Sequence, residues 1–92
     1  MSEFAQSRIV TVVNNQGLHA RPASLIVTTA RKFDAKVLIS KGNQQVEATD
    51  ILQVMSLGAA QGEQLSMEAS GNEAQGALDA LAELFERKFD EE

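Results

Sequence analysis

The sequence predicts a small α+β domain in two layers, with a four-stranded, mainly antiparallel sheet covered on one face by helices. Four short segments have the β-branched or alternating composition of strands. Two longer segments repeat apolar residues at helical spacing, and the whole order reads β-α-β-β-α-β-α. A chain of 92 residues can bury only a thin core, which favours two layers of secondary structure.

The first predicted strand leads through a turn into a helix. The β-branched run Arg8–Val13 predicts the strand, and Asn14–Gly17 predicts the turn. We expect a helix over Ala20–Lys32, with Arg31 and Lys32 in its last turn, where cations complement the helix dipole. The apolar stripe of this helix consists of Ala23, Ile26, Val27, Ala30 and Phe33.

A hairpin and a short helix follow. Ala35–Ser40 and Gln44–Ala48 are predicted strands joined by a tight glycine turn. Asp50 is a good N-cap for a short helix from Ile51 to about Leu57. Apolar residues occur almost all round this helix, so it is either wholly buried or carries an exposed apolar patch for a partner protein.

The last strand and the longest helix complete the fold. Gln64–Ala69 alternates apolar and polar residues, with Leu65, Met67 and Ala69 predicted to face the core. The apolar stripe of the last helix consists of Ala74, Ala77, Leu78, Leu81, Leu84, Phe85 and Phe89. Its solvent-exposed face is predicted to carry Asp79, Glu83 and Glu86.

Composition and charge exclude several classes of protein. The net charge of −5 comes entirely from the segment that starts at Glu73. Without an overall basic footprint or any tyrosine or tryptophan, nucleic-acid binding is not expected. The chain has no cysteine, signal peptide or long apolar run, which predicts a cytoplasmic protein without membrane insertion. We expect one monomeric domain over residues 1–92, with a loose lead-in at residues 1–6.

The stretch Asn15–Ala23 holds the candidate functional site. It contains the only histidine, His19, and the only proline, Pro22, with Arg21 between them. The helix is predicted to begin at or just after His19, so the backbone N–H groups of Ala20 and Arg21 have no intrahelical partner. Together with the helix dipole and the Arg21 guanidinium, these donors would bind an anion beside the imidazole, and phosphate is the obvious candidate.

A lone histidine near a helix start is usually a cap or a surface residue. Here the combination favours function, because a glycine turn, a histidine at the boundary, an arginine and a proline occur together. A metal site is not expected, since one histidine and scattered carboxylates form no ligand cluster, and we expect no cofactor. A hydrolase is not expected either, because His19 has no nucleophile partner nearby.

The segment Gly17-Leu18-His19-Ala20-Arg21-Pro22-Ala23 resembles the active-site signature of the HPr family, the phosphocarriers of the bacterial phosphoenolpyruvate-dependent phosphotransferase system. Ile51–Gly62 is similar to the second helix of the family and its exit, and the strand order and the acidic last helix also fit. The resemblance covers the chain from Arg8 onward and implies an HPr-like sandwich.

In this family the histidine takes a phosphoryl group from phosphorylated Enzyme I and passes it to an enzyme II A component. The resemblance implies that neutral His19 attacks through Nδ1, while Arg21 and the amides of Ala20 and Arg21 neutralise the phosphoryl oxygens. It also implies a modest, transient partner surface on the first two helices. That surface would consist of Ser24, Val27, Thr28 and Arg31 on the first helix and Ile51, Leu52 and Met55 on the second.

Two features bear on regulation and on the branch of the family. Many Gram-positive relatives carry, at the cap of the second helix, a serine that a kinase phosphorylates, and here Asp50 stands in its place. Asp50 is either simply a helix cap or a permanent anion that opposes docking to Enzyme I. The ending Phe85–Glu92 resembles the tails of nitrogen-type relatives (NPr), whereas Val54–Gly58 favours the sugar-type carriers, so the branch stays open.

Two functions of other classes compete with a phosphocarrier. One is a small ligand-binding or regulatory module on a ferredoxin-like sheet, in which His19 and Arg21 hold an anion without chemistry. The other is a protein-interaction domain that uses the apolar second helix and in which His19 is inert. Uptake of acid-labile phosphate on His19 from phosphoenolpyruvate and Enzyme I would separate the three.

Overall fold

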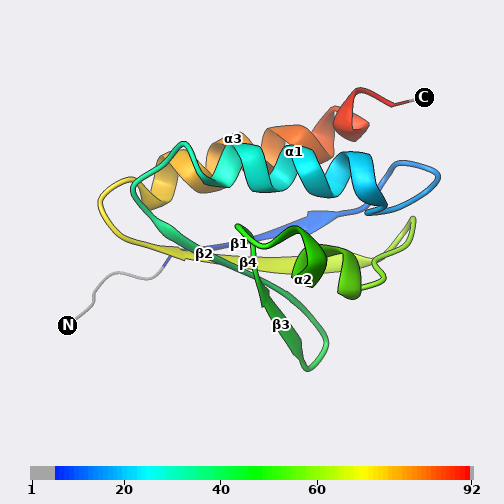
Figure 1. Ribbon diagram of the computed structural model, residues 1–92, viewed down its shortest axis with the longest axis horizontal. Helices are drawn as coiled ribbons and strands as arrows, with labels where there is room; N and C mark the ends of the chain where they lie inside the picture. The colour runs from blue at the N-terminus through cyan, green and yellow to red at the C-terminus, as the bar shows by residue number, and fades with distance from the viewer. Residues whose placement is uncertain (1–5, 92) are drawn as a thin grey trace.

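The computed structural model describes residues 6–91 and contains the elements in the predicted order (Figure 1). The strands are β1 (Gln6–Thr11), β2 (Lys36–Lys41), β3 (Gln44–Glu47) and β4 (Gln64–Ser70). The helices are α1 (Ala20–Ala30), α2 (Ile51–Ser56) and α3 (Ala74–Glu86), and a 3₁₀ turn, η1 (Lys88–Asp90), follows α3.

The strands form one sheet in the order β1-β4-β2-β3. All three neighbouring pairs are antiparallel, which confirms the predicted sheet. Because β4 lies between β1 and β2, the first and last strands of the chain are hydrogen-bonded neighbours, with Gln6 opposite Ala69 and Thr11 opposite Gln64. β2 and β3 form the predicted hairpin, which turns at Gly42 with φ of +60°.

Helices α1 and α3 lie side by side on one face of the sheet, as the two-layer prediction requires (Figure 1). The core fills the space between the layers. In β4, Leu65, Met67 and Ala69 are buried, as predicted, whereas Gln64 and Glu68 are exposed. Burial of such apolar surface, worth roughly 25 cal/mol per Å², is what holds the helices on the sheet.

The first strand begins and ends earlier than predicted. Gln6 belongs to β1 and not to a loose lead-in, and the rest of that expected lead-in lies outside the described residues. Val12 does not pair with β4, but its side chain is buried. Its N–H donates to Glu63 O at 2.9 Å and its carbonyl accepts from Gly62 N–H at 2.7 Å. These bonds join the end of β1 to the loop after α2.

Helix α1 is shorter than predicted at its C-terminal end. It ends at Ala30 with Arg31 as the C-cap, so the prediction that Arg31 and Lys32 lie in its last turn is wrong. The N–H of Lys32 bonds to the carbonyl three residues back, which tightens and ends the helix. The Arg31 guanidinium instead donates to Thr49 O at 3.1 Å and ties α1 to the segment before α2. Phe33 is partly buried beyond the helix end.

The short helix α2 starts where the sequence predicts. Asp50 Oδ1 accepts a hydrogen bond from Gln53 N–H at 3.1 Å, so Asp50 is the N-cap. Only Val54 of this helix is buried, and Leu52 is 75% exposed. The alternative in which the whole helix belongs to the core is therefore wrong. The exposed apolar residues are Ile51, Leu52 and Met55.

Helix α3 has the predicted stripe, but the chain leaves helical geometry before Phe89. Phe89 is fully buried, yet Lys88, Phe89 and Asp90 all have positive φ, of +56°, +53° and +61°. For non-glycine residues this conformation costs about 1–2 kcal/mol each. The ring of Phe89 packs edge-on against Phe85, with 4.9 Å between centroids, and this contact offsets part of the cost. The buried residues of α3 are Ala74, Ala77, Leu78, Leu81, Ala82, Leu84 and Phe85, and Asp79, Glu83 and Glu86 are exposed as predicted.

Candidate functional site

The loop between β1 and α1 is held in shape by Gly17. Its φ of +67° lies in the left-handed region that glycine adopts without penalty. The Asn14 side chain closes the turn by donating from Nδ2 to Gly17 O at 2.7 Å. Leu18 N–H then donates to Ala59 O at 3.0 Å. A Cβ on Gly17 would clash with this same carbonyl, so the close approach of the two loops requires glycine.

The loop after α2 also contacts the loop between β1 and α1. Gln61 Nε2 donates to Asn15 Oδ1 at 3.1 Å. Glu63 accepts from Ala60 N–H at 2.8 Å and pairs with Lys41 at 3.1 Å. These contacts, the backbone hydrogen bond first, lower the pKa of Glu63 below its ordinary value. A lowered pKa means that this stabilisation is present at neutral pH and is lost as the pH falls through that lowered value.

Helix α1 begins directly after His19, as predicted. His19 is the N-cap, and the first intrahelical hydrogen bond runs from Ala23 N–H to His19 O at 3.0 Å. The N–H groups of Ala20 and Arg21 therefore have no partner within the helix, and Pro22 has no N–H to satisfy. The positive end of the helix dipole thus presents two backbone donors next to His19.

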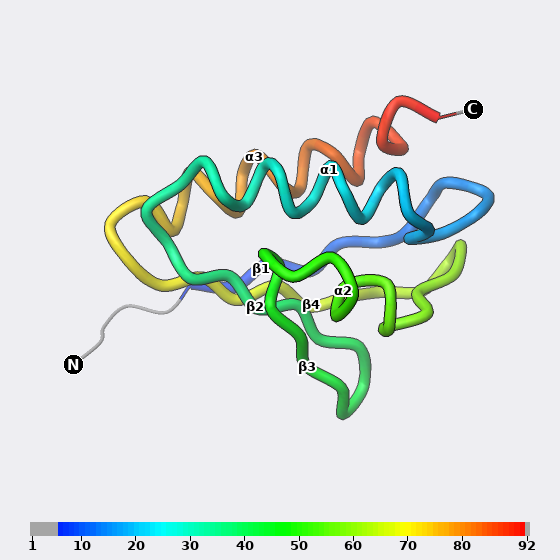
Figure 2. Tube along the Cα trace, in the orientation of Figure 1, coloured from blue at the N-terminus to red at the C-terminus, as the bar shows by residue number. Residues whose placement is uncertain are grey.

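The imidazole of His19 is partly exposed and contacts the C-terminal segment. Nε2 lies 2.9 Å from Glu91 Oε2, and the side chains are 35% and 17% exposed. Glu91 Oε1 accepts from Nδ2 of the buried Asn14 at 3.1 Å. Figure 2 shows the C-terminal segment at the same end of the molecule as the loop after β1. Sequence reasoning misses both Asn14 and Glu91, because no local pattern predicts that the end of the chain turns back onto His19.

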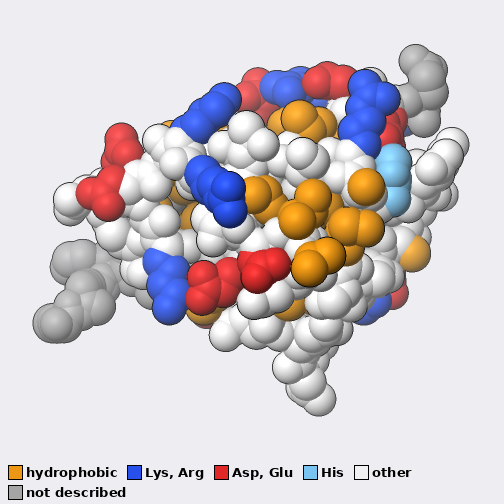
Figure 3. All heavy atoms as spheres, viewed as in Figure 1, with side chains coloured by type: hydrophobic (Ala, Val, Ile, Leu, Met, Phe, Trp, Pro, Cys, Tyr) orange, Lys and Arg blue, Asp and Glu red, His pale blue; other side chains and the backbone are white. Residues whose placement is uncertain are grey.

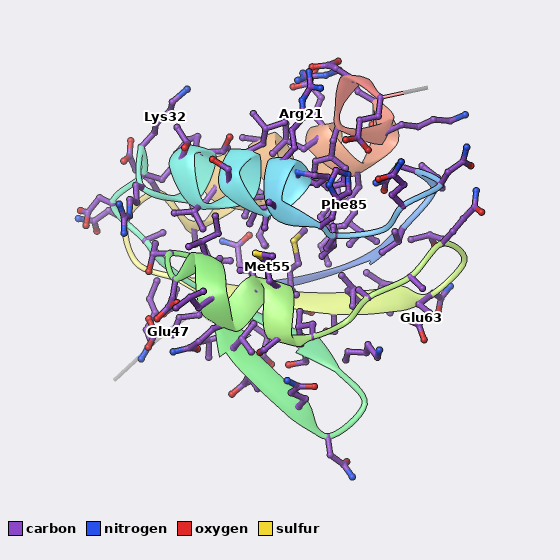
Figure 4. The ribbon with its side chains drawn as sticks, turned by 45° about the vertical axis from the view of Figure 1, so that its right-hand side comes forward. Arg21, Lys32, Glu47, Met55, Glu63 and Phe85 are labelled. Atoms are coloured by element: carbon purple, nitrogen blue, oxygen red, sulfur yellow. The ribbon has the colours of Figure 1, made fainter. Side chains whose placement is uncertain are left out.

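Arg21 lies on the same surface as the imidazole. It is exposed and lines a shallow hollow together with Asn15, Gln16, Asp90 and Glu91 (Figure 4). Among residues 6–91, no carboxylate lies within ion-pair distance of its guanidinium. Figure 3 shows the imidazole at the surface with basic and acidic side chains beside it. The exposed guanidinium therefore shares this hollow with the acidic residues Asp90 and Glu91.

A groove between α1 and α2 brings together most of the predicted partner residues. Met55 does not line this groove, but it is 38% exposed on α2 and faces α1 in Figure 4. Figure 3 shows a hydrophobic patch over these helices, with the imidazole near its edge. The groove is lined by Ser24, Val27, Thr28, Arg31, Thr49, Asp50, Ile51 and Leu52.

Within residues 6–91, no three His, Cys, Asp or Glu side chains group closely enough to hold a metal ion. None of the described helices is long and apolar enough to cross a membrane.

The family is decided by comparison with known proteins. Residues 6–87 match the family model described as "PTS HPr component phosphorylation site". The chain belongs to the HPr family of phosphocarriers. It is 40% identical over 85 residues to the phosphocarrier protein HPr of Treponema pallidum, covering 92% of this chain and 97% of that protein. It is also 37% identical over 84 residues to the phosphocarrier protein NPr of Shewanella violacea, covering 91% and 92%.

Solved HPr structures have the same architecture. The crystal structure of HPr from Thermoanaerobacter tengcongensis matches with a TM-score of 0.90 and 41% identity, covering 95% of this chain and 98% of that chain. The resemblance to the HPr family inferred from the residues around His19 is thereby confirmed, and so is the HPr-like sandwich. HPr and NPr relatives match at similar identity, so the branch of the family stays open.

Proposed function

We propose that this chain is a cytoplasmic phosphocarrier that accepts a phosphoryl group on Nδ1 of His19 from phosphorylated Enzyme I and passes it to an enzyme II A component. The observation that carries the proposal is the arrangement at the start of α1. A partly exposed imidazole stands at the start of α1, where two backbone N–H groups have no partner within the helix, and the exposed Arg21 follows two residues later. The chain acts as a carrier and not as an enzyme, because the group resides on it between two partners.

The chemistry needs little more than this arrangement. The lone pair of Nδ1 forms the N–P bond while the bond from phosphorus to the donor breaks, and the electron pair of that bond leaves with the donor. Negative charge on the three equatorial oxygens faces Arg21 and the N–H groups of Ala20 and Arg21. Because these donors are exposed rather than enclosed, they stabilise the phosphoryl group without holding it too tightly to pass on.

Recognition of both partners is assigned to the groove between α1 and α2 and the patch beside it. An apolar centre made by Ile51, Leu52 and Met55 is joined by the cation of Arg31 at its edge. Such a surface suits a partner with an apolar hollow and an acidic rim. A single small surface used for several partners favours short-lived complexes.

Phosphoryl uptake by the intact protein tests the proposal. The protein is incubated with phosphoenolpyruvate, magnesium and a bacterial Enzyme I, and the expected product carries one acid-labile phosphoryl group on His19, located by mass spectrometry. Adding enzyme II A of the sugar type or of the nitrogen type should remove the group, and the faster acceptor identifies the branch. A chain that binds inorganic phosphate reversibly but is never modified would contradict the proposal and favour an anion-binding module. A chain that does neither would favour a protein-interaction domain.

Replacement of Arg21 tests the stabilising role of its guanidinium. Arg21→Ala is expected to slow phosphoryl uptake by about 100- to 1,000-fold, the range typical for loss of one donor to a developing oxyanion. Arg21→Lys should recover only part of the rate. An ammonium keeps the positive charge but lacks the planar set of N–H donors with which a guanidinium binds two phosphate oxygens at once. The measurement is the single-turnover rate with phosphorylated Enzyme I. Lys32→Ala, just beyond the other end of α1, is the matched control and should keep the wild-type rate (Figure 4).

Replacement of Asp50 separates its two interpretations. Asp50→Ser keeps a good N-cap and removes the charge, so stability and the rate of phosphoryl uptake should both stay near the wild-type values if Asp50 is simply a cap. Asp50→Ala should lower the free energy of unfolding by about 1 kcal/mol, because the bond from Gln53 N–H is lost. Urea denaturation and stopped-flow uptake measure the two effects. Faster uptake by Asp50→Ser would instead show that the carboxylate opposes docking.

A further inference from the structure

The loop after α2, residues 57–63, contacts the loop between β1 and α1 through its middle residues. Ala59 O accepts from Leu18 N–H at 3.0 Å, and Leu18 directly precedes His19. Both Ala59 and Leu18 are buried. Gln61 Nε2 donates to Asn15 Oδ1 at 3.1 Å in a second contact between the two loops. The position of the loop after α2 therefore determines where the chain enters α1.

Lys41, the last residue of β2, contacts both ends of the same loop. Its ammonium donates to Gly58 O at 3.3 Å near the start of the loop and lies 3.1 Å from Glu63 Oε1 at its end (Figure 4). The same carboxylate oxygen accepts from Ala60 N–H at 2.8 Å inside the loop. Gly58 and Gly62 have positive φ, +59° and +93°. Because glycine backbone is the freest in a chain, contacts that span the loop determine how tightly it is held.

We infer that Lys41 and Glu63 are positioning residues for phosphoryl transfer, which together hold the loop after α2 and so keep the His19 ring where it can attack. The inference rests on the function proposed above. The effect of the pair reaches the ring through the bond between Ala59 O and Leu18 N–H. Transfer is sensitive to such a path, because a displacement of about 1 Å in a reacting group can slow a reaction by about 100-fold.

Substitutions of the two residues separate the parts of the pair. Lys41→Met keeps the aliphatic stem and removes both contacts of the ammonium. Glu63→Gln removes the charge but keeps a carbonyl oxygen for Ala60 N–H, so its effect should be smaller. The double variant should behave like Lys41→Met alone, because residues that act as one unit do not have additive effects. Lys36→Met is the matched control, since it makes the same replacement at an exposed position at the other end of β2.

The first readout is hydrogen exchange of the Leu18 amide in the unphosphorylated protein, measured by NMR. The slowest amides of α3 report unfolding of the whole domain, so they are the internal reference. Relative to them, Leu18 should exchange about 3- to 10-fold faster in Lys41→Met, the effect of losing one exposed ion pair and one hydrogen bond. Lys36→Met should leave this ratio at the wild-type value.

The second readout is uptake from phosphorylated Enzyme I. In Lys41→Met, kcat should fall about 3- to 10-fold, in step with the loosening of the loop. KM should stay unchanged, because neither Lys41 nor Glu63 lines the groove between α1 and α2. Lys41→Arg should recover the wild-type kcat, since a guanidinium keeps the charge and can donate to both oxygens.

The outcomes distinguish this inference from the proposed function. Leu18 exchange that changes only as much as that of the α3 amides overturns the inference, as does a kcat of Lys41→Met equal to that of Lys36→Met. A rise in KM with kcat unchanged also overturns it, because that result would place Lys41 on the docking surface. Additive effects in the double variant would show that Lys41 and Glu63 act separately, and they too overturn it. A wild-type protein that takes up no phosphoryl group overturns the proposed function, whatever the exchange rates show.

Discussion

His19→Ala is expected to abolish phosphoryl uptake completely. His19 is the only histidine in the chain, so no second imidazole can take its place. The fold should survive, because within residues 6–91 the side chain makes one hydrogen bond, to Glu91, and the first helical bond of α1 uses the backbone carbonyl of His19. The free energy of unfolding should change by less than about 1 kcal/mol. Acid-labile phosphate measured after incubation with phosphoenolpyruvate and Enzyme I should fall to background.

Two control measurements test whether His19→Ala still folds and still binds Enzyme I. Circular dichroism and the urea midpoint should match those of the wild type. The variant should also compete with the wild type for Enzyme I, because the groove between α1 and α2 is unchanged. Acid-labile phosphate that persists in His19→Ala would place the acceptor elsewhere and contradict the assignment.

Gly17→Ala is expected to destabilise the protein by about 3 kcal/mol. About 1–2 kcal/mol comes from holding a non-glycine residue at a φ of +67°. The rest comes from the clash of the new Cβ with Ala59 O, which must move and strain its bond from Leu18 N–H. Such a loss is a large fraction of the 5–15 kcal/mol typical of a domain. The urea midpoint should fall by roughly 1–3 M with the slope unchanged.

Gly42→Ala is the matched control for the steric part of this effect. Gly42 has nearly the same φ, +60°, but no atom lies within 4 Å of an added Cβ. Its replacement should cost only the 1–2 kcal/mol of backbone strain. Equal losses in the two variants would show that the contact of Gly17 with Ala59 contributes nothing. A loss of phosphoryl uptake is expected only for Gly17→Ala, because the hairpin of β2 and β3 lies away from the start of α1 (Figure 1).

Most of the fold could be predicted from the sequence, because its signals are local. The alternation in Gln64–Ala69 and the stripe of the last helix each record which side chains face the core. The ends of elements were less predictable, because tertiary hydrogen bonds decide them. Val12 has strand composition, yet its backbone pairs with Gly62 and Glu63 rather than with β4.

Some residues of the candidate site could likewise be predicted from the local sequence, and others could not. His19 and Arg21 stand out because glycine, histidine, arginine and proline occur together within one short segment. Asn14 and Glu91 give no such signal. The turn that places Glu91 beside His19 is made of lysine, phenylalanine and aspartate at positive φ, where glycine or asparagine would be the expected sequence marker. Only the buried Phe89, which extends the apolar stripe, hints that this end of the chain packs on the domain.

The contact between Glu91 and His19 spans 72 residues, which has a consequence for the order of folding. A link across so much of the chain gains little until the intervening sheet has assembled and brought its ends close, because the entropy of closing the loop opposes it. The contact therefore forms late, after the strands have paired. The carboxylate thus reaches the ring only in a molecule whose sheet has already assembled.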